Sequence, residues 1–531
     1  MQLHVLTKGS TAKAVETSLP GLLESKVASR IASKDFTVWG KDAEAESSIR
    51  LGWVTSAHDS QPLVERILSL KNEFNEQGVD RFVLCGMGGS SLAPEVITNS
   101  AGVDLVVLDS TNPEQVRHAL AGDLQRTAVV VSSKSGSTVE TDSQKRLFEQ
   151  AFTEAGIDKT DRIIVVTDPG SPMEQAAKAD GYRIFNADPT VGGRYSALTA
   201  FGLVPSGLAG ADIQTLLNEA LAASNLFAED VESNPALVLG AALARTKNGE
   251  SYADKIVIVE DGTQIKGLGD WAEQLIAEST GKLGRGILPI VVPSNANELQ
   301  NDASDQLIVR LGGASSTAVE DQVVVSGSLG AQFLLWEYAT VIASALIGIN
   351  PFDQPDVESA KIAARGMLEG RAEEVHEDFS ENGVEVCALG FDLGSANSVK
   401  DAIDALLATV ADDGYLSIHA YLDRTAYGSA QELRELLSKR SGRPTTFGWA
   451  PRFLHSTGQY HKGGPAQGVY LQIVSRASND LAVPGRDFTL GELIASQAAG
   501  DAAVLAEHGR PVLTLTVSDV SSGLELISGS I

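Results

Sequence analysis

The chain has 531 residues, which exceeds one ordinary domain of about 150 residues and indicates about three domains. Hydrophobic residues make up 43% and charged residues 21% of the chain, so a large core is available and extensive disorder is excluded. A formal net charge of −28 disfavours binding to nucleic acids and to anionic membrane surfaces. A small anion can still bind, because backbone N–H groups and a few cations can hold it locally.

We expect a soluble cytoplasmic protein. The N-terminal residues 1–21 contain no apolar run typical of a secretion signal. The apolar stretch 333–349 is short for a membrane span and contains Glu337, so it predicts a buried helix. The two cysteines, Cys85 and Cys387, give no disulfide or thiolate–metal pattern.

Strands and helices are predicted to alternate along the chain. Short apolar runs separated by helix-length segments indicate parallel β–α–β units with both sheet faces covered. The predicted strands are 81–85, 103–108, 128–131, 162–166 and 182–185, then 255–259 and 287–292, and finally 415–420, 445–449, 469–474 and 512–517. We therefore predict an α/β fold with two doubly wound parallel-sheet αβα sandwich domains and a C-terminal α/β domain. The expected parts are an N-terminal helical segment (1–60), the first sandwich (61–210), the second sandwich (211–365) and the C-terminal domain (366–531).

A glycine loop, GMGGSS at 86–91, follows the first predicted strand and precedes a helix. Glycines let the backbone turn tightly and approach a ligand, and the N–H groups of a helix start attract an anion. The loop nearly matches the dinucleotide pattern G-x-G-x-x-G, with Ser91 at the third glycine position and Asp109 where a ribose-binding acid would lie. On this loop alone, a nicotinamide cofactor, another anion and a tight turn without a ligand all stay open.

A serine loop, SSKSGST at 132–138, also lies between a predicted strand and a helix. Five hydroxyls and one lysine in seven residues suit a phosphate monoester, whereas N-capping of a helix needs only one hydroxyl. Both loops are expected at the same edge of the sheet, where open α/β sheets bind ligands. A phosphorylated small molecule is therefore favoured over a dinucleotide.

Six segments carry a resemblance to a known family. The loops GMGGSSLAP at 86–94 and SSKSGSTVET at 132–141 are similar to the phosphosugar-binding loops of sugar-isomerase (SIS) domains. The layout resembles the isomerase half of transaldolase–isomerase fusions, without a transaldolase portion. Four further segments resemble the glucose-6-phosphate isomerase family: VGGRYS at 191–196, EQLIAESTGK at 273–282, NPFDQPDVESAK at 350–361 and FLHSTGQYHKGG at 453–464.

The resemblance implies an aldose–ketose isomerase of glycolysis and gluconeogenesis that uses no cofactor and binds a sugar phosphate. It would move a proton between C1 and C2 through an enediol(ate). Glu278 matches the base, Arg194 the arginine that stabilises the enediolate, and Lys361 the lysine that assists ring opening. We expect burial near the end of an apolar helix to raise the pKa of Glu278. The matching substrate and phosphate contacts are Gly89, Ser90, Ser133, Lys134, Ser135, Thr138, Gln274 and Gln354.

Histidine departs from the family pattern. Ordinary members place the ring-opening histidine between the base and the lysine, and no histidine lies between Glu278 and Lys361 here. The segment LHSTGQ around His455 resembles the family's histidine segment, so we infer that the C-terminal domain delivers His455, with His461 and Lys462 as second candidates. Family members are generally dimers in which this histidine crosses from the partner subunit. We expect a homodimer, and whether His455 acts in its own chain stays open.

Two smaller departures are Asp356, where the family usually has glycine, and Gly136, where its phosphate loop usually has a larger residue. We expect no metal site, because His455 and His461 lack an acidic partner and metal-ligand spacing. Three other interpretations stay open: a dual isomerase that also accepts mannose 6-phosphate, a non-catalytic SIS-type phosphosugar sensor, and a nicotinamide-dependent oxidoreductase. Ser91 and the serine loop disfavour the last of these.

Overall fold

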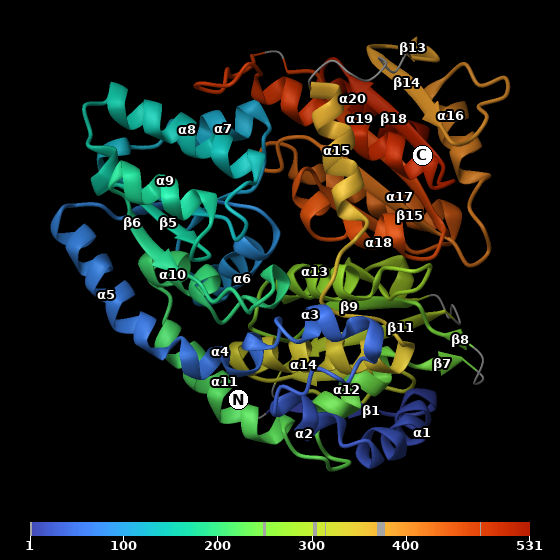
Figure 1. Ribbon diagram of the computed structural model, residues 1–531. Coiled ribbons are helices and arrows are strands. Elements are labelled where there is room, and N and C mark those ends of the chain that lie inside the picture. Colours follow the sequence, from blue (N-terminus) through green and yellow to red (C-terminus); the bar gives the residue numbers. More distant parts are fainter. Residues whose placement is uncertain (1–2, 248–250, 301–304, 314, 369–376, 478) are drawn as a thin grey trace.

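The computed structural model describes residues 3–247, 251–300, 305–313, 315–368, 377–477 and 479–531. This part of the chain contains three large β-sheets of five, five and six strands, each with its own helices (Figure 1). We call each sheet with its helices a unit. A two-stranded pair, β7 (Thr246–Lys247) and β8 (Ser251–Tyr252), lies apart from them. The predicted α/β class, with parallel-sheet αβα units, is confirmed.

The first unit contains both predicted anion-binding loops. Its parallel strands run in the order β3 (Val106–Leu108), β2 (Arg81–Gly86), β4 (Thr127–Ser132), β5 (Ile163–Thr167) and β6 (Arg183–Asn186). Side chains alternate between the two faces, so Leu84 packs into one hydrophobic layer and Val83 into the other. The helices of the Leu84 face are α5 (Gln61–Glu76), α6 (Leu92–Ala101) and α10 (Ala200–Ala209); those of the Val83 face are α7 (Pro113–Leu120), α8 (Val139–Glu154) and α9 (Pro172–Asp180).

The second unit combines four parallel strands with one antiparallel edge strand. The order is β1 (His4–Thr7), β12 (Val323–Ser326), β11 (Gln306–Gly312), β9 (Lys255–Asp261) and β10 (Leu288–Val292). The N-terminal segment, which was expected to be helical, thus also contains the strand β1. The four residues of β1 are exposed or partly exposed, so they show no clear alternation of apolar and polar residues in the sequence. The other helices before α5 are α1 (Ser10–Glu24), α2 (Val27–Ala32), α3 (Glu44–Ser47) and α4 (Ser56–Asp59).

The helices of the second unit include the longest apolar helix in the described part of the chain. This helix is α14 (Leu329–Ile347). Among the described residues it is the one helix long and apolar enough to cross a membrane, but 89% of its most apolar stretch is buried inside the protein. The helix predicted for 333–349 is therefore present and buried. Its neighbours are α11 (Ile213–Phe227), α12 (Pro235–Leu243) and α13 (Leu268–Thr280).

The third unit has a mixed six-stranded sheet. Its order is β13 (Phe379–Glu381), β14 (Val384–Leu389), β18 (Val512–Val517), β17 (Gly468–Ser475), β15 (Tyr415–Tyr421) and β16 (Thr445–Trp449), of which the last four are parallel. All four strands predicted for this part are present. The helices are α16 (Val399–Leu407), α17 (Glu432–Ser441), α18 (Gly458–Gly463), α19 (Leu490–Glu507) and α20 (Val520–Ser530).

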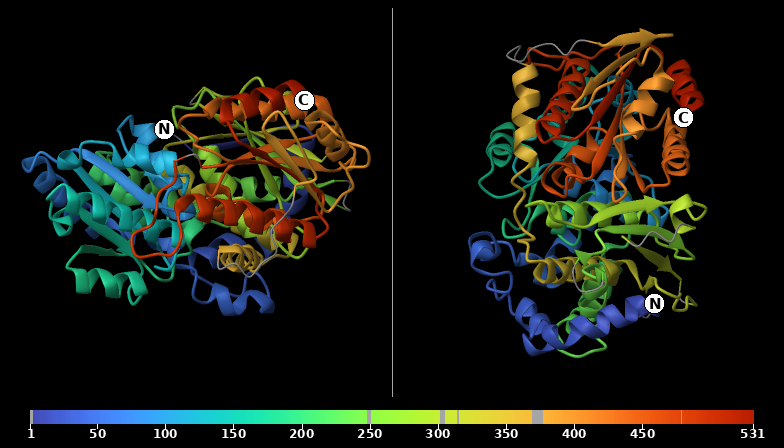
Figure 2. Two further views of the ribbon diagram at one scale, coloured as in Figure 1. Left: turned by 90° about the horizontal axis from the view of Figure 1, so that it is seen from above. Right: turned by 90° about the vertical axis from the view of Figure 1, so that its right-hand side faces the viewer.

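The third unit packs directly on the other two. Val257 and Ile290 of the second sheet share a hydrophobic cluster with Tyr460 of α18. Helix α15 (Val357–Leu368) leaves the second unit and runs along α19, as Figures 1 and 2 show. The two helices approach closely because position 500 is glycine: a Cβ there would lie 2.7 Å from the backbone nitrogen of Ala364.

Candidate active site

The glycine loop after β2 packs against two other loops. Gly88 has a φ of +53°, which favours glycine. A Cβ on Gly88 would lie 2.5 Å from the carbonyl oxygen of His455, and a Cβ on Gly89 would lie 2.1 Å from the carbonyl oxygen of Gly193. Ser90 is buried beside them. The missing side chains of these glycines therefore let the glycine loop, the Gly193 loop and the His455 loop pack closely together. This packing role is separate from the predicted contact with a ligand.

The serine loop after β4 holds itself together by its own hydroxyls. Ser133 Oγ lies 3.1 Å from Thr138 Oγ1 and accepts a hydrogen bond from the backbone N–H of Gly136. Gly136 has a φ of +69°, and a Cβ there would lie 2.8 Å from the backbone nitrogen of Met173, which explains the glycine at this position. Ser135 is exposed. The loop is therefore pre-formed, with its hydroxyls near one another.

Lys134 of the serine loop is paired with an acid. Its Nζ donates to Asp168 Oδ2 at 2.5 Å. Burial lowers the pKa of Lys134, and the charge of Asp168 opposes that shift. A bound phosphate would therefore compete with Asp168 for this ammonium group.

Glu278, the predicted base, lies near the C-terminal end of α13 and is 7% exposed. Its Oε2 accepts a hydrogen bond from Gln274 Nε2 at 3.1 Å, and its Oε1 lies 3.8 Å from Arg194 Nη1. Burial raises the pKa of Glu278, while the nearby charge of Arg194 opposes the rise. The result is a carboxylate that gains a proton more readily than an exposed glutamate.

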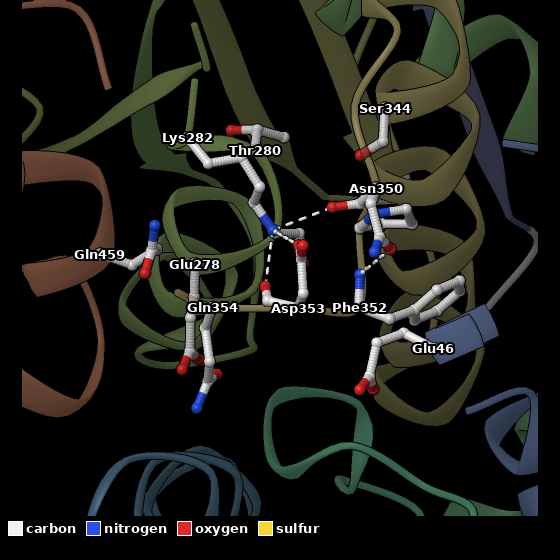
Figure 3. A network of polar contacts seen from close by, with 12 residues as sticks. Glu46, Glu278, Thr280, Lys282, Ser344, Asn350, Phe352, Asp353, Gln354 and Gln459 are labelled. Atoms are coloured by element: carbon white, nitrogen blue, oxygen red, sulfur yellow. Dashed lines mark hydrogen bonds and ion pairs between the residues drawn. The ribbon is translucent and has the colours of Figure 1, made fainter. Parts of the chain in front are cut away.

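Arg194 is buried between the first and second units. Its Nε donates to Ser279 Oγ at 2.9 Å, and its Nη1 donates to Gln354 Oε1 at 2.8 Å. Its Nη2 donates to the carbonyl oxygens of Pro351 and Asp353. The guanidinium is thus held rigidly beside Glu278. Gln354 reaches the same group, and its side chain points the same way as that of Glu278 in Figure 3.

Lys282 is a site-forming residue that the sequence analysis did not single out. Its Nζ donates to the carbonyl oxygens of Asn350 and Asp353 and to Asp353 Oδ1, at 2.9, 2.6 and 2.7 Å (Figure 3). Burial and the charge of Arg194 lower the pKa of Lys282 to about 8. This lysine ties the segment after α13 to the segment that carries Gln354. Its position in ESTGK, four residues after the base, was the available signal.

His455 comes from the loop after β16 and lies beside the serine loop. Its Nε2 donates to Glu140 Oε1 at 2.8 Å, and the same oxygen accepts a hydrogen bond from Gln497 Nε2 at 2.7 Å. The backbone carbonyl oxygen of His455 accepts a hydrogen bond from Gln274 Nε2 at 2.8 Å. Gln274 therefore links the base and the histidine within one chain. The sequence analysis missed Glu140 and Gln497; Glu140 was visible within SSKSGSTVET, whereas Gln497 had no signal.

The second candidates in the same segment have other partners. His461 is buried, its Nδ1 lies 3.0 Å from the Tyr415 hydroxyl, and burial holds its pKa well below the usual value. Lys462 is buried too and donates to Asp501 Oδ1 at 2.5 Å. Both side chains therefore bind partners inside the third unit. Lys462 also borders the cavity described next.

A cavity of about 230 Å³ lies between the serine loop, α15 and the His455 loop. Lys361 is on α15, and its side chain lies outside the described part of the structure. Among the described residues, no cluster of three or more histidine, cysteine or acidic side chains could hold a metal ion. The lining residues include Ser135, Ser137, Thr138, Glu140, Arg365, His455, Lys462 and Gln497.

Comparison with known proteins decides the family. A family model described as phosphoglucose isomerase matches residues 54–285. A probable glucose-6-phosphate isomerase of Natronomonas pharaonis is 30% identical over 372 residues, which cover 60% of this chain and 86% of that protein. The chain belongs to the glucose-6-phosphate isomerase family. A probable glucose-6-phosphate isomerase of Haloarcula marismortui is similar as well, with 29% identity over 343 residues, 55% of this chain and 78% of that protein.

Solved structures show the same fold at lower identity. A hypothetical protein of Thermus thermophilus superposes with a TM-score of 0.59 and 24% identity, covering 69% of this chain and all of that chain. A glucose-6-phosphate isomerase of Chlamydia trachomatis superposes with a TM-score of 0.51 and 18% identity, covering 63% of this chain and 75% of that one. The glucose-6-phosphate isomerase fold therefore accounts for much of the chain.

Asp356, a departure from the glucose-6-phosphate isomerase pattern, forms two hydrogen bonds with Gln459. Asp356 stands where the family usually has glycine, and its Oδ2 accepts a hydrogen bond from Gln459 Nε2 at 2.6 Å. The backbone N–H of Asp356 donates to Gln459 Oε1 at 3.0 Å. The aspartate therefore connects the start of α15 to α18, which follows the His455 loop.

Proposed function

We propose that the protein is a glucose-6-phosphate isomerase, which interconverts glucose 6-phosphate and fructose 6-phosphate. The observation that carries the proposal is the side chain of Gln274, which contacts both the Glu278 carboxylate and the backbone of His455. Gln274 and His455 are 181 positions apart in the chain, so the fold is what joins them. A base and a second acid–base group that are linked through one glutamine side chain suit aldose–ketose isomerisation, although His455 lines the cavity and Glu278 does not.

In this proposal the serine loop binds the phosphate. The hydroxyls of Ser135 and Thr138 border the cavity and donate to phosphate oxygens, and the positive end of the α8 dipole favours the negative charge. The phosphate is far from C1 and C2, so its binding energy orients the reacting carbons without changing the chemistry.

Ring opening is assigned to His455. Its imidazole takes the proton of the anomeric hydroxyl and passes it to the ring oxygen, as the bond between that oxygen and the anomeric carbon (C1 of glucose, C2 of fructose) breaks. Glu140, bonded to Nε2, orients the imidazole and stabilises its charged form. The resemblance supports a part for Lys361 in the same step.

Isomerisation is assigned to Glu278. Its carboxylate takes the proton from C2 of the open aldose and returns it to C1, while the hydroxyl proton passes from O2 to O1. Negative charge develops on oxygen in the enediolate between these transfers. Arg194 supplies a fixed positive charge beside the base, and fixed charges stabilise such a transition state more than mobile water does.

A coupled assay tests the proposal. Purified protein with fructose 6-phosphate should form glucose 6-phosphate without a cofactor of its own; the product is detected with glucose-6-phosphate dehydrogenase and NADP⁺. Mannose 6-phosphate in place of fructose 6-phosphate tests the dual isomerase. Fructose without phosphate, with free glucose measured by glucose oxidase, tests the need for the phosphate. Binding of fructose 6-phosphate without turnover would contradict the proposal and favour a phosphosugar sensor.

The acidic limb of the pH–rate profile is expected to lie above pH 4.5, the ordinary pKa of a glutamate. Glu278 must be ionised to accept a proton, and burial raises its pKa, so activity is lost as the pH falls through that raised value. The measurement is kcat/KM for fructose 6-phosphate from acidic to neutral pH, with circular dichroism at each pH as a control for folding. Full activity at pH 4.5 in folded protein would contradict the assignment.

A further inference from the structure

A buried arginine holds the His455 loop on the first unit. Arg452 lies three residues before His455 in the same short helical turn, and its side chain is 12% exposed. Its Nε donates to Asp109 Oδ2 at 2.5 Å, and its Nη2 donates to Glu95 Oε2. Both carboxylates belong to the first unit, whereas the arginine belongs to the third.

A second arginine completes the contact. Arg424, in the loop after β15, donates to Glu95 Oε1 at 2.9 Å and to the carbonyl oxygen of Val107 at 3.3 Å. It lies 3.6 Å from Asp109 Oδ1. We call Arg424, Arg452, Glu95 and Asp109 the arginine network. The network pairs two positive with two negative side chains, and two further acids, Asp270 and Glu273, also interact electrostatically with Arg452.

The charges of the network are strongly coupled. Burial alone would raise the pKa of Glu95, but Arg452 and Arg424 hold it at about 2. The acidic partners raise the pKa of Arg452 against the effect of burial. Removing Arg452 would therefore leave the carboxylates of Glu95 and Asp109 without their main partner.

The arginine network adjoins both the glycine loop and the His455 loop. Glu95 is on α6, which follows the glycine loop, and a Cβ on Gly88 of that loop would meet the His455 carbonyl oxygen at 2.5 Å. The His455 loop is thus fixed on one side by Gly88 and Gln274 and on the other by Arg452. Asp109, considered above as a ribose-binding acid, has its carboxylate occupied by Arg452 instead.

We propose that Arg452 is a positioning residue, which holds His455 at the distance from Glu140 and Glu278 that ring opening needs. This inference rests on the proposed isomerase activity and adds to it a role for the contact between the first and third units. Misplacing a catalytic group by about 1 Å can cost about 10²-fold in rate. The bidentate fork of arginine, which lysine lacks, fits two carboxylates at once.

A small cavity makes the proposal testable by chemical rescue. About 190 Å³ of open space adjoins Arg452. Removing the side chain would enlarge this space, which the acidic side chains of Glu95, Asp270 and Glu273 also line, so a free guanidinium ion can take the place of the lost group. The residues around it include Glu95, Arg424, Arg452, Phe453 and Ser456.

The experiment uses full-length Arg452→Ala in the coupled assay with fructose 6-phosphate. We expect kcat to fall by about 10²-fold with KM changed by less than about threefold, because phosphate binding stays intact. Millimolar guanidinium should raise the kcat of Arg452→Ala by at least about tenfold, whereas sodium chloride at equal ionic strength should leave it unchanged. Binding of an acyclic hydroxamate mimic of the enediolate should be unchanged, since it needs no ring opening.

A matched control removes an exposed arginine of the same unit. Arg476 pairs with Glu385 and has a side chain that is 63% exposed, so Arg476→Ala should keep normal kcat. If Arg452→Ala does not fold, Arg452→Lys keeps the charge without the fork and should still lower kcat selectively over KM.

Three outcomes overturn the positioning role. They are an Arg452→Ala enzyme with kcat within about twofold of wild type, a loss of kcat that guanidinium does not restore, and an Arg452→Lys enzyme with normal kcat. Wild-type protein without turnover would overturn the proposed function and this role with it. Active wild type with an unimpaired Arg452→Ala would overturn the positioning role alone.

Discussion

Glu278→Gln is expected to lower isomerase turnover by at least about 10³-fold while sugar-phosphate binding persists. The substitution keeps the size of the side chain and removes only its ability to accept a proton from carbon. Arg194 and Gln274, the neighbours of Glu278, are fixed by other partners as well, so the site should keep its shape. The loss should therefore appear in kcat and not in the dissociation constant.

The measurement pairs the coupled assay with calorimetric titration of fructose 6-phosphate. Glu320→Gln changes an exposed glutamate of the same unit that pairs with Lys8, so it is the matched control and should turn over normally. Retained turnover in Glu278→Gln would refute the base assignment. Loss of both binding and turnover would indicate a structural role for Glu278 instead.

His455→Ala is expected to lower turnover of the cyclic sugar phosphates by about 10²-fold or more. The imidazole is the group that the Glu140 carboxylate orients at the cavity. An acyclic enediolate mimic should still bind, because its binding bypasses ring opening. Turnover within about twofold of wild type would contradict the role of His455.

Mixed subunits test whether His455 acts in its own chain, as the Gln274 contacts indicate. Differently tagged Glu278→Gln and His455→Ala chains are co-expressed, and protein carrying both tags is purified. If both groups act in one chain, every site lacks one of them and no activity is recovered. If the histidine crossed between subunits, half of the sites in a mixed dimer would be intact, and recovered activity would contradict the arrangement in one chain.

The strands of the first unit could be predicted because they are buried on both faces. Runs such as 128–131 are apolar throughout, which is typical of a parallel sheet between two helical layers. The short strand β1 could not be predicted, because its partner β12 lies more than 300 residues away and its own residues are half exposed. Pairing over such a distance leaves no periodicity in the local sequence.

The candidate site could be predicted as far as its residues lie in recognisable segments. Glu278, Arg194 and His455 were identified in that way, and the fold brings them to one place. Gln497 could not be identified, because it lies on an ordinary helix and matters only through its hydrogen bond to Glu140. The role of Arg452 depends likewise on the meeting of two units, which no segment shows alone.

The glycine at position 500 lets the third unit cover one side of α15 closely. Because α15 lies flush on α19 at this point, a chain cut after residue 368 would leave that helix with one bare flank. Such a fragment would still contain the whole stretch matched by the family model, 54–285, but it would lack His455 and the helix that α15 packs against. The third unit therefore both supplies His455 to the candidate site and covers α15, so it is an integral part of the folded protein.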